Sequence, residues 1–330
     1  MSTNKELKDV LELGRIFWDS QVFLTACKLR IFDYIKKPAE VFYIAKKINC
    51  DVRATNMLLD ALVSLGFVGQ KGKKYAVKSK YSDFLLSDSD KNVLSILDHY
   101  YHMWDDWGKL TNCIKTGMAL EKKVSIELKR QFTKSFITGM DNLTKFQKER
   151  VLNCLDLKGV KKILDIGSGP ATYLREILKK NQNIMATILD LPDAAEVGKD
   201  FVIKDNLEKR ISFIEGDIGE VELDNNYDCV FIFQVLHALN EKTRNLAVKK
   251  AYNALNRGGK IYIHEFFLNE KKTFPRENVI FRLNMLIHAN GGDNLSVKEI
   301  KNLLESAGFS VKKEFIFKKP ATVLIEGIKT

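Results

Sequence analysis

A short stretch of the 330-residue chain, residues 163–171 with the sequence ILDIGSGPA, combines an apolar run with a glycine-rich turn. The run is typical of a buried strand and the next residues have helical spacing, so we predict strand, turn and helix. Gly167 and Gly169 let a ligand approach the backbone, and the helix N-terminus favours an anionic group. The turn is neither a P-loop nor a complete G-x-G-x-x-G/A pattern, since position 172 is threonine. A tight turn without a ligand is the open alternative.

Three aspartates end or directly follow successive strand-like runs. They are Asp165 in ILDIG, Asp190 in IMATILD and Asp217 in ISFIEGD. Open α/β sheets bind ligands at the carboxyl ends of their strands, and a carboxylate after the second strand can accept hydrogen bonds from both hydroxyls of a ribose. Helix N-caps are the alternative for any one of these residues. The three together predict a ligand site at one sheet edge.

The second part of the chain, from about residue 151 to residue 330, alternates apolar strand-like runs with charged helical stretches. This pattern predicts a mainly parallel sheet covered by helices on both faces. The last residues, VKKEFIFKKPATVLIEGIK, predict two further strands joined by a turn at Lys319-Pro320.

The first part of the chain predicts a small helical domain over residues 1–95, followed by a helical linker over residues 96–150. Helices are expected at about 39–48 and 52–65, and FVGQKGKKYAVKSKY predicts a hairpin. Helices followed by such a hairpin indicate a winged helix-turn-helix.

The charge balance is basic, since 53 Lys+Arg against 42 Asp+Glu gives 53 − 42 = +11. The hairpin is dense in lysine, so a winged-helix DNA-binding regulator is the rival function. Its putative recognition helix, however, offers Arg53 and Asn56 and then mainly apolar residues and Asp60. A groove-reading helix needs base-contacting polar side chains. We therefore do not expect a nucleic-acid partner.

The cysteines indicate a reducing compartment, because the chain has five of them, widely spaced and without a C-x-x-C pair. The N-terminus is polar, and no apolar run approaches the roughly 18–20 residues of a membrane helix. We expect a cytoplasmic protein with no membrane span and no metal site.

The order of these motifs resembles class I S-adenosylmethionine-dependent O-methyltransferases, and more narrowly the two-domain small-molecule type that includes caffeate, acetylserotonin and bacterial polyketide enzymes. The matching pieces are ACKLRIFDYI, LLDALVSLGFV, LDIGSGPA, LDLPD, GDI, VLHALNE, GGKIYIHEF and ANGGDNLSVKEIKNLLESAGF. The resemblance implies a Rossmann-like, seven-stranded α/β methyltransferase domain over residues 151–330. It also implies a winged-helix domain over residues 1–95 that forms a homodimer, and S-adenosyl-L-methionine as cofactor, with S-adenosyl-L-homocysteine as product.

The resemblance further implies which residues contact the cofactor. Around its methionine end and ribose it places Asp165, Gly167, Ser168, Gly169, Asp190 and Leu191. Asp217 meets the adenine amino group and Ile218 the adenine ring. Phe136, Met140 and Thr144 match a segment that closes over the cofactor.

His237 matches the family's catalytic histidine, and Glu265 matches the carboxylate that orients its imidazole. A neutral phenol is a poor nucleophile, and a base within hydrogen-bond reach typically contributes about 10²–10⁴-fold. Ala238 and Leu239 depart from the family's H-D-W segment, and Asn294, next to Asp293, replaces a second carboxylate. Because both His237 and Glu265 are present, O-methylation is our first interpretation. Because of these departures, C- or N-methylation of a small molecule stays open.

The acceptor is expected between the helical layer and the carboxyl edge of the sheet. The candidate substrate-binding residues are Tyr101, Trp104, Met285, His288 and Asn294. Aromatic and methionine side chains suit a planar apolar acceptor. Simple packing between the domains is the alternative.

Overall fold

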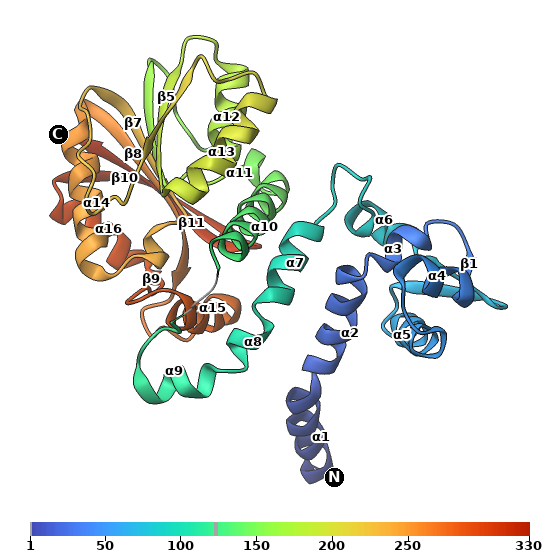
Figure 1. Cartoon of the computed structure of the whole chain (residues 1–330). Coiled ribbons are helices and arrows are strands. Elements are labelled where there is room, and N and C mark those ends of the chain that lie inside the picture. The colour runs from blue at the N-terminus through green and yellow to red at the C-terminus, as the bar shows by residue number, and fades with distance from the viewer. Residues whose placement is uncertain (1, 122–124) are drawn as a thin grey trace. The chain divides into compact units, whose positions relative to one another are not determined.

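The computed structural model describes residues 2–121 and 125–330, and the chain divides into two compact units, Met1–Trp104 and Asp105–Thr330 (Figure 1). Each unit has its own hydrophobic core and is described by itself.

The first unit is mainly helical, with a small three-stranded antiparallel sheet in the order β1-β3-β2. Its elements are α1 (Ser2–Arg15), α2 (Phe17–Lys28), α3 (Ile31–Tyr34), β1 (Ala39–Glu40), α4 (Val41–Ile48), α5 (Val52–Ser64), β2 (Val68–Lys71), β3 (Lys74–Val77), α6 (Ser79–Leu85) and α7 (Leu94–His102). The predicted hairpin is confirmed, because β2 and β3 pair in register from Val68–Val77 to Lys71–Lys74.

Helix α5 buries an apolar face and uses its polar residues inside the unit. Leu59 and Leu62 are fully buried. Asn56 Nδ2 donates to Asp60 Oδ2 at 2.8 Å, and the Tyr75 hydroxyl donates to Asp60 Oδ1 at 2.6 Å. This helix therefore stabilises its own unit through both its apolar and its polar side chains.

The second unit is built on a sheet whose main path has the order β10-β11-β8-β7-β4-β5-β6, with β9 pairing to β8. The strands are β4 (Lys162–Ile166), β5 (Met185–Asp190), β6 (Ile211–Glu215), β7 (Tyr227–Phe233), β8 (Leu255–Leu268), β9 (Leu295–Ser296), β10 (Phe309–Lys318) and β11 (Ala321–Lys329). The five strands from β6 to β8 are parallel, and β11 and β10 continue the sheet antiparallel. This confirms the predicted Rossmann-like sheet and its terminal pair of strands.

Helices cover both faces of this sheet, as Figure 1 shows for α14 and α16 on one face and α12 and α13 on the other. The helices of this unit are α8 (Trp104–Trp107), which begins at the boundary, α9 (Leu110–Thr116), α10 (Ile126–Lys145), α11 (Lys148–Leu152), α12 (Thr172–Lys180), α13 (Pro192–Lys204), α14 (Glu241–Ala254), α15 (Arg276–His288) and α16 (Val297–Ser306), with a 3₁₀ turn η1 (Leu236–Ala238).

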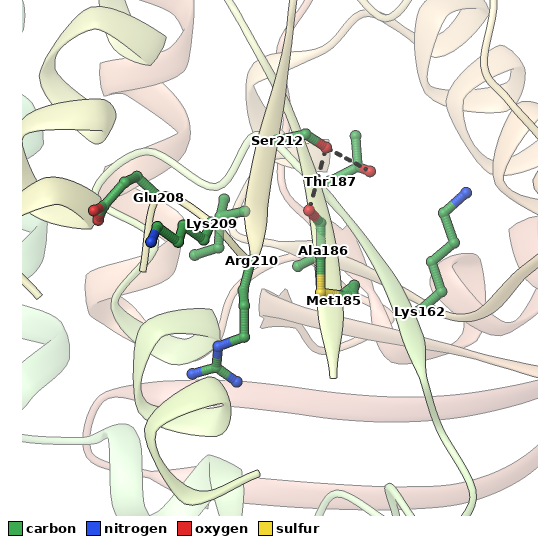
Figure 2. A pocket seen from close by; sticks show the side chains of 9 residues that line it. Lys162, Met185, Ala186, Thr187, Glu208, Lys209, Arg210 and Ser212 are labelled. Carbon is green, nitrogen blue, oxygen red and sulfur yellow. Dashed lines mark hydrogen bonds between the residues drawn. The ribbon is translucent and has the colours of Figure 1, made fainter. Parts of the chain in front are cut away.

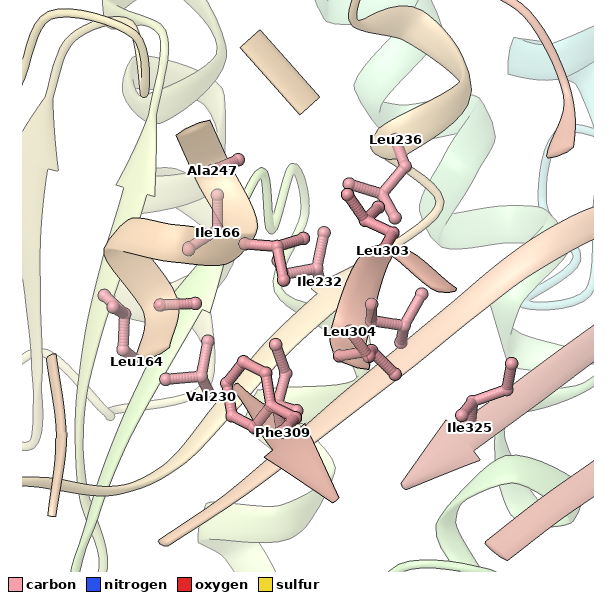
Figure 3. Close-up of a cluster of buried hydrophobic side chains, with 14 of the residues drawn as sticks. Leu164, Ile166, Val230, Ile232, Leu236, Ala247, Leu303, Leu304, Phe309 and Ile325 are labelled. Carbon is pink, nitrogen blue, oxygen red and sulfur yellow. The ribbon is translucent and has the colours of Figure 1, made fainter. Parts of the chain in front are cut away.

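The strands are apolar on both sides because each face packs against helices. Leu164 and Ile166 contribute to the cluster with α14 and α16, part of which Figure 3 shows, whereas Ile163 joins the cluster on the opposite face. Full burial of such a side chain contributes about 1.5–3 kcal/mol. The hydrophobic clusters on the two faces of the sheet thus fix the positions of the strand ends.

Strand order reverses at β4, which pairs with β5 on one side and with β7 on the other. Such a switch point opens a crevice at the carboxyl ends of the strands. Asp165 lies near the end of β4 and Asp190 closes β5, so both aspartates lie at the sheet edge beside this switch point. In the part of the chain that the structure describes, no helix is long and apolar enough to cross a membrane.

Candidate active site

The turn after β4 requires glycine for steric reasons. Gly167 has φ of +70°, and a Cβ at this position would lie 2.3 Å from a Val235 methyl group. A Cβ on Gly198 of α13 would lie 2.6 Å from the carbonyl oxygen of Gly169. Helix α13 and the segment after β7 therefore pack directly on the turn. A residue larger than glycine at position 167 or 198 would displace the turn or its neighbours.

Asp165 stabilises this turn through a hydrogen bond with Ser168. It is 3% exposed, and its Oδ2 accepts a hydrogen bond from the Ser168 hydroxyl at 2.6 Å. Burial raises the pKa of Asp165 to about 7, the Ser168 bond opposes this, and the neighbouring charge of Asp190 adds to it. Two carboxyl groups thus share a site of low dielectric.

Asp190 binds the glycine turn through its side chain. Its Oδ2 accepts from the backbone N–H of Gly169 at 2.7 Å, and its Oδ1 accepts from that of Leu191 at 2.8 Å. Burial raises the pKa of Asp190, and the two backbone bonds oppose that effect. A carboxylate offers about four acceptor positions, so two remain for ligand hydroxyls. This donor-poor, acceptor-rich edge fits a nucleoside with its two ribose hydroxyls.

The third aspartate of the series also lies at this edge. Asp217 follows β6, is exposed, and its Oδ1 accepts from the backbone of Gly219 at 2.6 Å. Ile218 is buried and packs in the same hydrophobic cluster as Ile166, whereas Leu191 is 54% exposed. The three predicted aspartates therefore lie at one edge of the sheet. Ile218 packs in the hydrophobic core.

Helix α10 lies against the glycine turn, since Ile137 Cδ1 would be 3.5 Å from a Cβ at Gly169. Phe136, Met140 and Thr144 follow at intervals of four residues and so share one stripe of this helix. The structure therefore places all three predicted residues on one helix that packs beside the turn.

His237 and Glu265 are in direct contact. His237 lies in η1 just after β7, and Glu265 lies in β8. His237 Nδ1 is 2.6 Å from Glu265 Oε1, and the backbone N–H of His237 donates to Oε2 at 3.2 Å. Both side chains are buried, and the rings of Phe266 and Phe281 lie 5.6 and 5.2 Å from the imidazole.

The charge on Glu265 decides how the imidazole is protonated. Burial on its own would raise the pKa of Glu265, but the interactions with His237 and the backbone bond from Phe266 outweigh it and lower that pKa. Glu265 is therefore an ionised acceptor, and Nδ1 of His237 carries the proton that it accepts. This leaves the lone pair of Nε2 as the basic position of the ring.

The residues that replace the second expected carboxylate have other partners. Asp293 accepts two hydrogen bonds from Arg282 of α15, at 2.6 and 2.9 Å. Asn294 is fully buried and donates to the carbonyl of Asn278 at 3.1 Å, while its Oδ1 has no hydrogen-bond partner among the described residues. Asp293 is thus engaged by an arginine, and Asn294 keeps one acceptor unused.

The candidate acceptor residues fall into both units. Met285 is 7% exposed on α15, and His288 Nδ1 lies 3.8 Å from Asp106 Oδ2. Tyr101 and Trp104 belong to the first unit. Their role toward an acceptor stays a prediction.

Two residues were not predicted from the sequence: Arg244, which contacts the turn that carries His237, and Gln234, which precedes that turn in the chain. Arg244 is buried, and its guanidinium donates to the carbonyls of Leu236 and Leu239 at 3.0 and 2.8 Å and to that of Asp293 at 3.1 Å. Gln234 has φ of 58°, and its buried Nε2 has no hydrogen-bond partner within residues 2–121 and 125–330. Arg244 was detectable, because it shares a helical stripe with the buried residues 247, 248 and 251.

A hollow at the opposite end of the strands is separate from this site. Figure 2 shows its lining, which includes Lys162 and Met185, the first residues of β4 and β5, and Arg210 just before β6. The Ser212 hydroxyl there contacts Thr187 Oγ1 at 3.1 Å. No group of three or more His, Cys, Asp or Glu residues that could hold a metal is found among the described residues.

Comparisons with known proteins identify the family of this chain. A family model described as an O-methyltransferase domain matches residues 116–310, and one described as an O-methyltransferase dimerisation domain matches residues 11–88. Acetylserotonin O-methyltransferase of Gallus gallus is 27% identical over 318 residues, covering 91% of each chain. The methyltransferase PigF of Serratia sp. is 24% identical over 327 residues, covering 95% of this chain and 93% of PigF.

Solved structures show the same fold. An O-methyltransferase family protein from Burkholderia thailandensis superposes with a TM-score of 0.89 at 20% identity, over 98% of both chains. Human N-acetylserotonin methyltransferase in complex with SAM superposes with a TM-score of 0.86 at 24% identity, over 98% of this chain and 97% of that one. Because the methyltransferase model alone covers more than half of the sequence, this chain belongs to the S-adenosylmethionine-dependent O-methyltransferase family.

Proposed function

We propose that this enzyme methylates a hydroxyl group of a small planar aromatic acceptor, with His237 as general base and Glu265 as the residue that orients it. The contact of 2.6 Å between His237 Nδ1 and Glu265 Oε1 carries this proposal. It leaves Nε2 as the basic nitrogen, at the sheet edge where the cofactor-binding aspartates gather.

The cofactor, when bound, supplies an electrophilic methyl group on a sulfonium. Asp190 accepts hydrogen bonds from the ribose hydroxyls with the acceptor positions that Gly169 and Leu191 leave unused. Asp165, Gly167, Ser168 and Gly169 form the wall at the methionine end, and Asp217 with Ile218 the adenine end. Phe136, Met140 and Thr144 cover the cofactor from α10.

His237 Nε2 takes the proton of the acceptor hydroxyl as the oxygen attacks. Glu265 holds the ring in place and stabilises the imidazolium that forms, because its carboxylate is already ionised. Phe266 and Phe281 flank the imidazole and keep bulk water from it.

The apolar rings beside His237 and the relatives support the proposed acceptor class. Phe281 and Met285 lie on α15 one helical turn apart and present an aromatic and a thioether surface. Relatives include an acetylserotonin enzyme and a 3-hydroxy-5-methyl-1-naphthoate 3-O-methyltransferase of Streptomyces sahachiroi. We therefore expect a fused-ring or indole-like hydroxyl, with His288 and Asn294 as further contacts of the acceptor in the second unit.

The protein acts as a homodimer through its first unit. Residues 11–88 match a dimerisation domain, and α1 and α2 expose large apolar side chains, among them Leu11, Phe17 and Trp18. The polar residues of α5 bond within the unit, which favours this role over DNA recognition. The cysteines are free thiols, which favours a cytoplasmic location.

The test is transfer of a ¹³C-methyl group from labelled S-adenosylmethionine to a panel of hydroxyindoles and hydroxynaphthoates, each paired with its amino analogue. The carbon chemical shift of the product identifies the methylated atom. We expect an O-methyl signal from a hydroxy acceptor and none from its amino analogue. Label on carbon or nitrogen would contradict the proposal and favour C- or N-methylation.

A further inference from the structure

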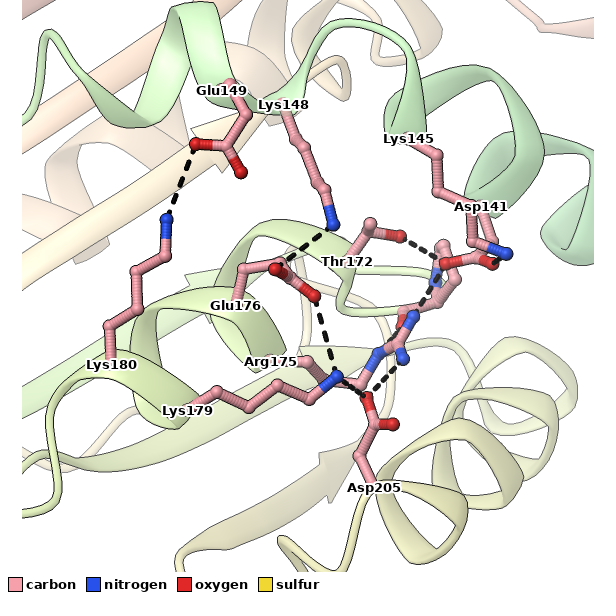
Figure 4. Close-up of polar contacts among 11 residues, drawn as sticks. Asp141, Lys145, Lys148, Glu149, Thr172, Arg175, Glu176, Lys179, Lys180 and Asp205 are labelled. Atoms are coloured by element: carbon pink, nitrogen blue, oxygen red, sulfur yellow. Dashed lines mark hydrogen bonds and ion pairs between the residues drawn. The ribbon is translucent and has the colours of Figure 1, made fainter. Parts of the chain in front are cut away.

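A buried ion cluster links α10 to the glycine turn through Arg175 of α12 (Figure 4). The Arg175 side chain is 8% exposed. Its Nε donates to the carbonyl of Pro170 at 2.9 Å, its Nη2 to Asp141 Oδ1 at 2.6 Å, and its Nη1 to Asp205 Oδ2 at 2.5 Å. One planar group therefore joins the turn, helix α10 and the end of α13.

Asp141 is the anchor of α10 in this cluster. It is 2% exposed, and its Oδ1 also accepts from the Thr172 hydroxyl at 2.7 Å. Thr172 is the first residue of α12, directly after the turn. Asp141 lies one helical turn after Ile137, the residue that packs near Gly169, so this face of α10 is held at two points.

The adjacent stripe of α10 carries Phe136, Met140 and Thr144. Phe136 and Met140 directly precede the anchored residues Ile137 and Asp141, and Thr144 follows Asp141 by three residues. Successive residues of a helix are about 100° apart, so fixing the Ile137–Asp141 face also fixes the direction of this stripe. The stripe holds the side chains that we place over the cofactor.

We infer that Arg175 is a positioning residue that couples α10 to the glycine turn and thereby sets the affinity for the cofactor. The inference rests on the proposed placement of Phe136, Met140 and Thr144 against S-adenosylmethionine. Its fork geometry matters, because lysine offers a single ammonium group and cannot reach Pro170, Asp141 and Asp205 together.

A purely structural role for this ion cluster makes a different prediction. Removing one member of a buried ion pair is destabilising, whereas replacing both members with apolar residues is often neutral or stabilising. If the cluster served only stability, cofactor binding would recover as far as stability does in the double variant Asp141→Leu/Arg175→Met, in which Lys145 and Asp205 lose their buried partners but Asp205 keeps Lys179. If it positions α10, that double variant regains stability but not affinity.

The experiment measures the Kd of S-adenosylhomocysteine by calorimetry, with thermal unfolding in parallel. The variants are Arg175→Lys, Asp141→Asn, the double variant, and Lys179→Met as control. Lys179 pairs with the same Asp205 at 2.8 Å but sits at the exposed side of the cluster. We expect Kd to rise about tenfold or more in the first three proteins and to stay within about twofold in Lys179→Met.

Steady-state kinetics give the second readout. In Arg175→Lys the KM for S-adenosylmethionine should rise in parallel with Kd, while kcat at saturating cofactor stays within about threefold, because His237 and Glu265 are untouched. A loss confined to kcat, or an unchanged Kd in a folded Arg175→Lys protein, would overturn the inference.

Phe136→Ala separates this inference from the cofactor placement on which it rests. A raised Kd in both Phe136→Ala and Arg175→Lys supports the coupling. An unchanged Kd in Phe136→Ala shows that the proposed cofactor face of α10 is wrong. If the Kd is nevertheless raised in Arg175→Lys, Arg175 does not act through the stripe of Phe136, Met140 and Thr144, and the inference is refuted. An unchanged Kd in Arg175→Lys alone refutes the coupling and leaves the cofactor placement intact.

Discussion

Glu265 contacts His237 twice, with Oε1 at 2.6 Å from the ring Nδ1 and Oε2 at 3.2 Å from the backbone nitrogen. One buried carboxylate thus fixes both the imidazole and the 3₁₀ turn that carries it. Arg244 holds the same turn from the other side through the carbonyls of Leu236 and Leu239. The candidate base is therefore held before any substrate arrives, which is how a residue on a loop attains precise placement.

The first prediction concerns Glu265→Gln. The amide keeps the size of the side chain but loses the charge that stabilises the imidazolium, and it can donate to Nδ1 and so favour the wrong tautomer. We expect kcat to fall by about 10²-fold or more, with the Kd of S-adenosylhomocysteine unchanged. Glu326→Gln is the matched control, since Glu326 is also buried but accepts from Tyr262 on β8. Equal losses of kcat in both variants would show a general effect of removing buried charge.

Asp190→Ala removes the carboxylate that we place on the ribose. Cofactor affinity should fall by about tenfold or more, because the hydroxyls lose a charged acceptor whose hydrogen bonds are worth about 1.5–3 kcal/mol. Titration calorimetry with S-adenosylhomocysteine measures the loss. The control is Asp200→Ala, at an exposed position on α13, the helix that follows Asp190. Wild-type affinity in Asp190→Ala would refute the ribose assignment.

The raised pKa of Asp165 predicts a pH-dependent stability. Its pKa is about 7 in the folded protein against 3.8 as the ordinary value, so the folded state binds more protons than the unfolded state between these limits. The free energy of unfolding of the ligand-free protein therefore falls as pH rises through this window.

Asp165→Asn removes this titration while keeping an acceptor for the Ser168 hydroxyl. Relative to wild type, its free energy of unfolding should increase by about 2–3 kcal/mol between pH 5 and pH 8. Urea denaturation at the two pH values measures the difference. Asp217→Asn, at an exposed position of the same edge, should show no such increase. A pH-independent difference for Asp165→Asn would contradict the buried-carboxyl interpretation.

Much of the fold was predictable because its signals are local. Apolar runs such as YDCVFIF and GGKIYIHEF specify buried strands, and Gly-Ser-Gly specifies the turn after β4. The sheet edge of Asp165, Asp190 and Asp217 followed from the rule that parallel strands end on the same side. Glu265 could be paired with His237 only through the family resemblance, since 28 residues separate them.

The partners of the polar supports were not predictable, because they are distant in sequence, although the helical stripe of Arg244 on α14 indicated that its side chain is buried. Arg175 meets Asp141 34 residues away, and Arg244 meets the carbonyl of Asp293 49 residues away. Nothing in a local pattern distinguishes these arginines from solvated ones, apart from their place on buried helical stripes. Asp293 is the neighbour of Asn294, which stands where the family has a second carboxylate, and only the structure reveals the bidentate pairing of Asp293 with Arg282.

The central claim is that His237 is the base, and single-turnover methyl transfer by His237→Ala tests it most directly. The reaction is run with saturating S-adenosylmethionine and with two acceptors of the class proposed above, one an ordinary phenol and one whose acidic hydroxyl is already ionised at the assay pH. We expect the rate to fall by about 10²–10⁴-fold with the phenol and far less with the ionised acceptor, which needs no base, while the Kd of S-adenosylhomocysteine stays within about twofold. A rate within about threefold of wild type with the phenol, or equal losses with both acceptors, would contradict the role of His237 as base.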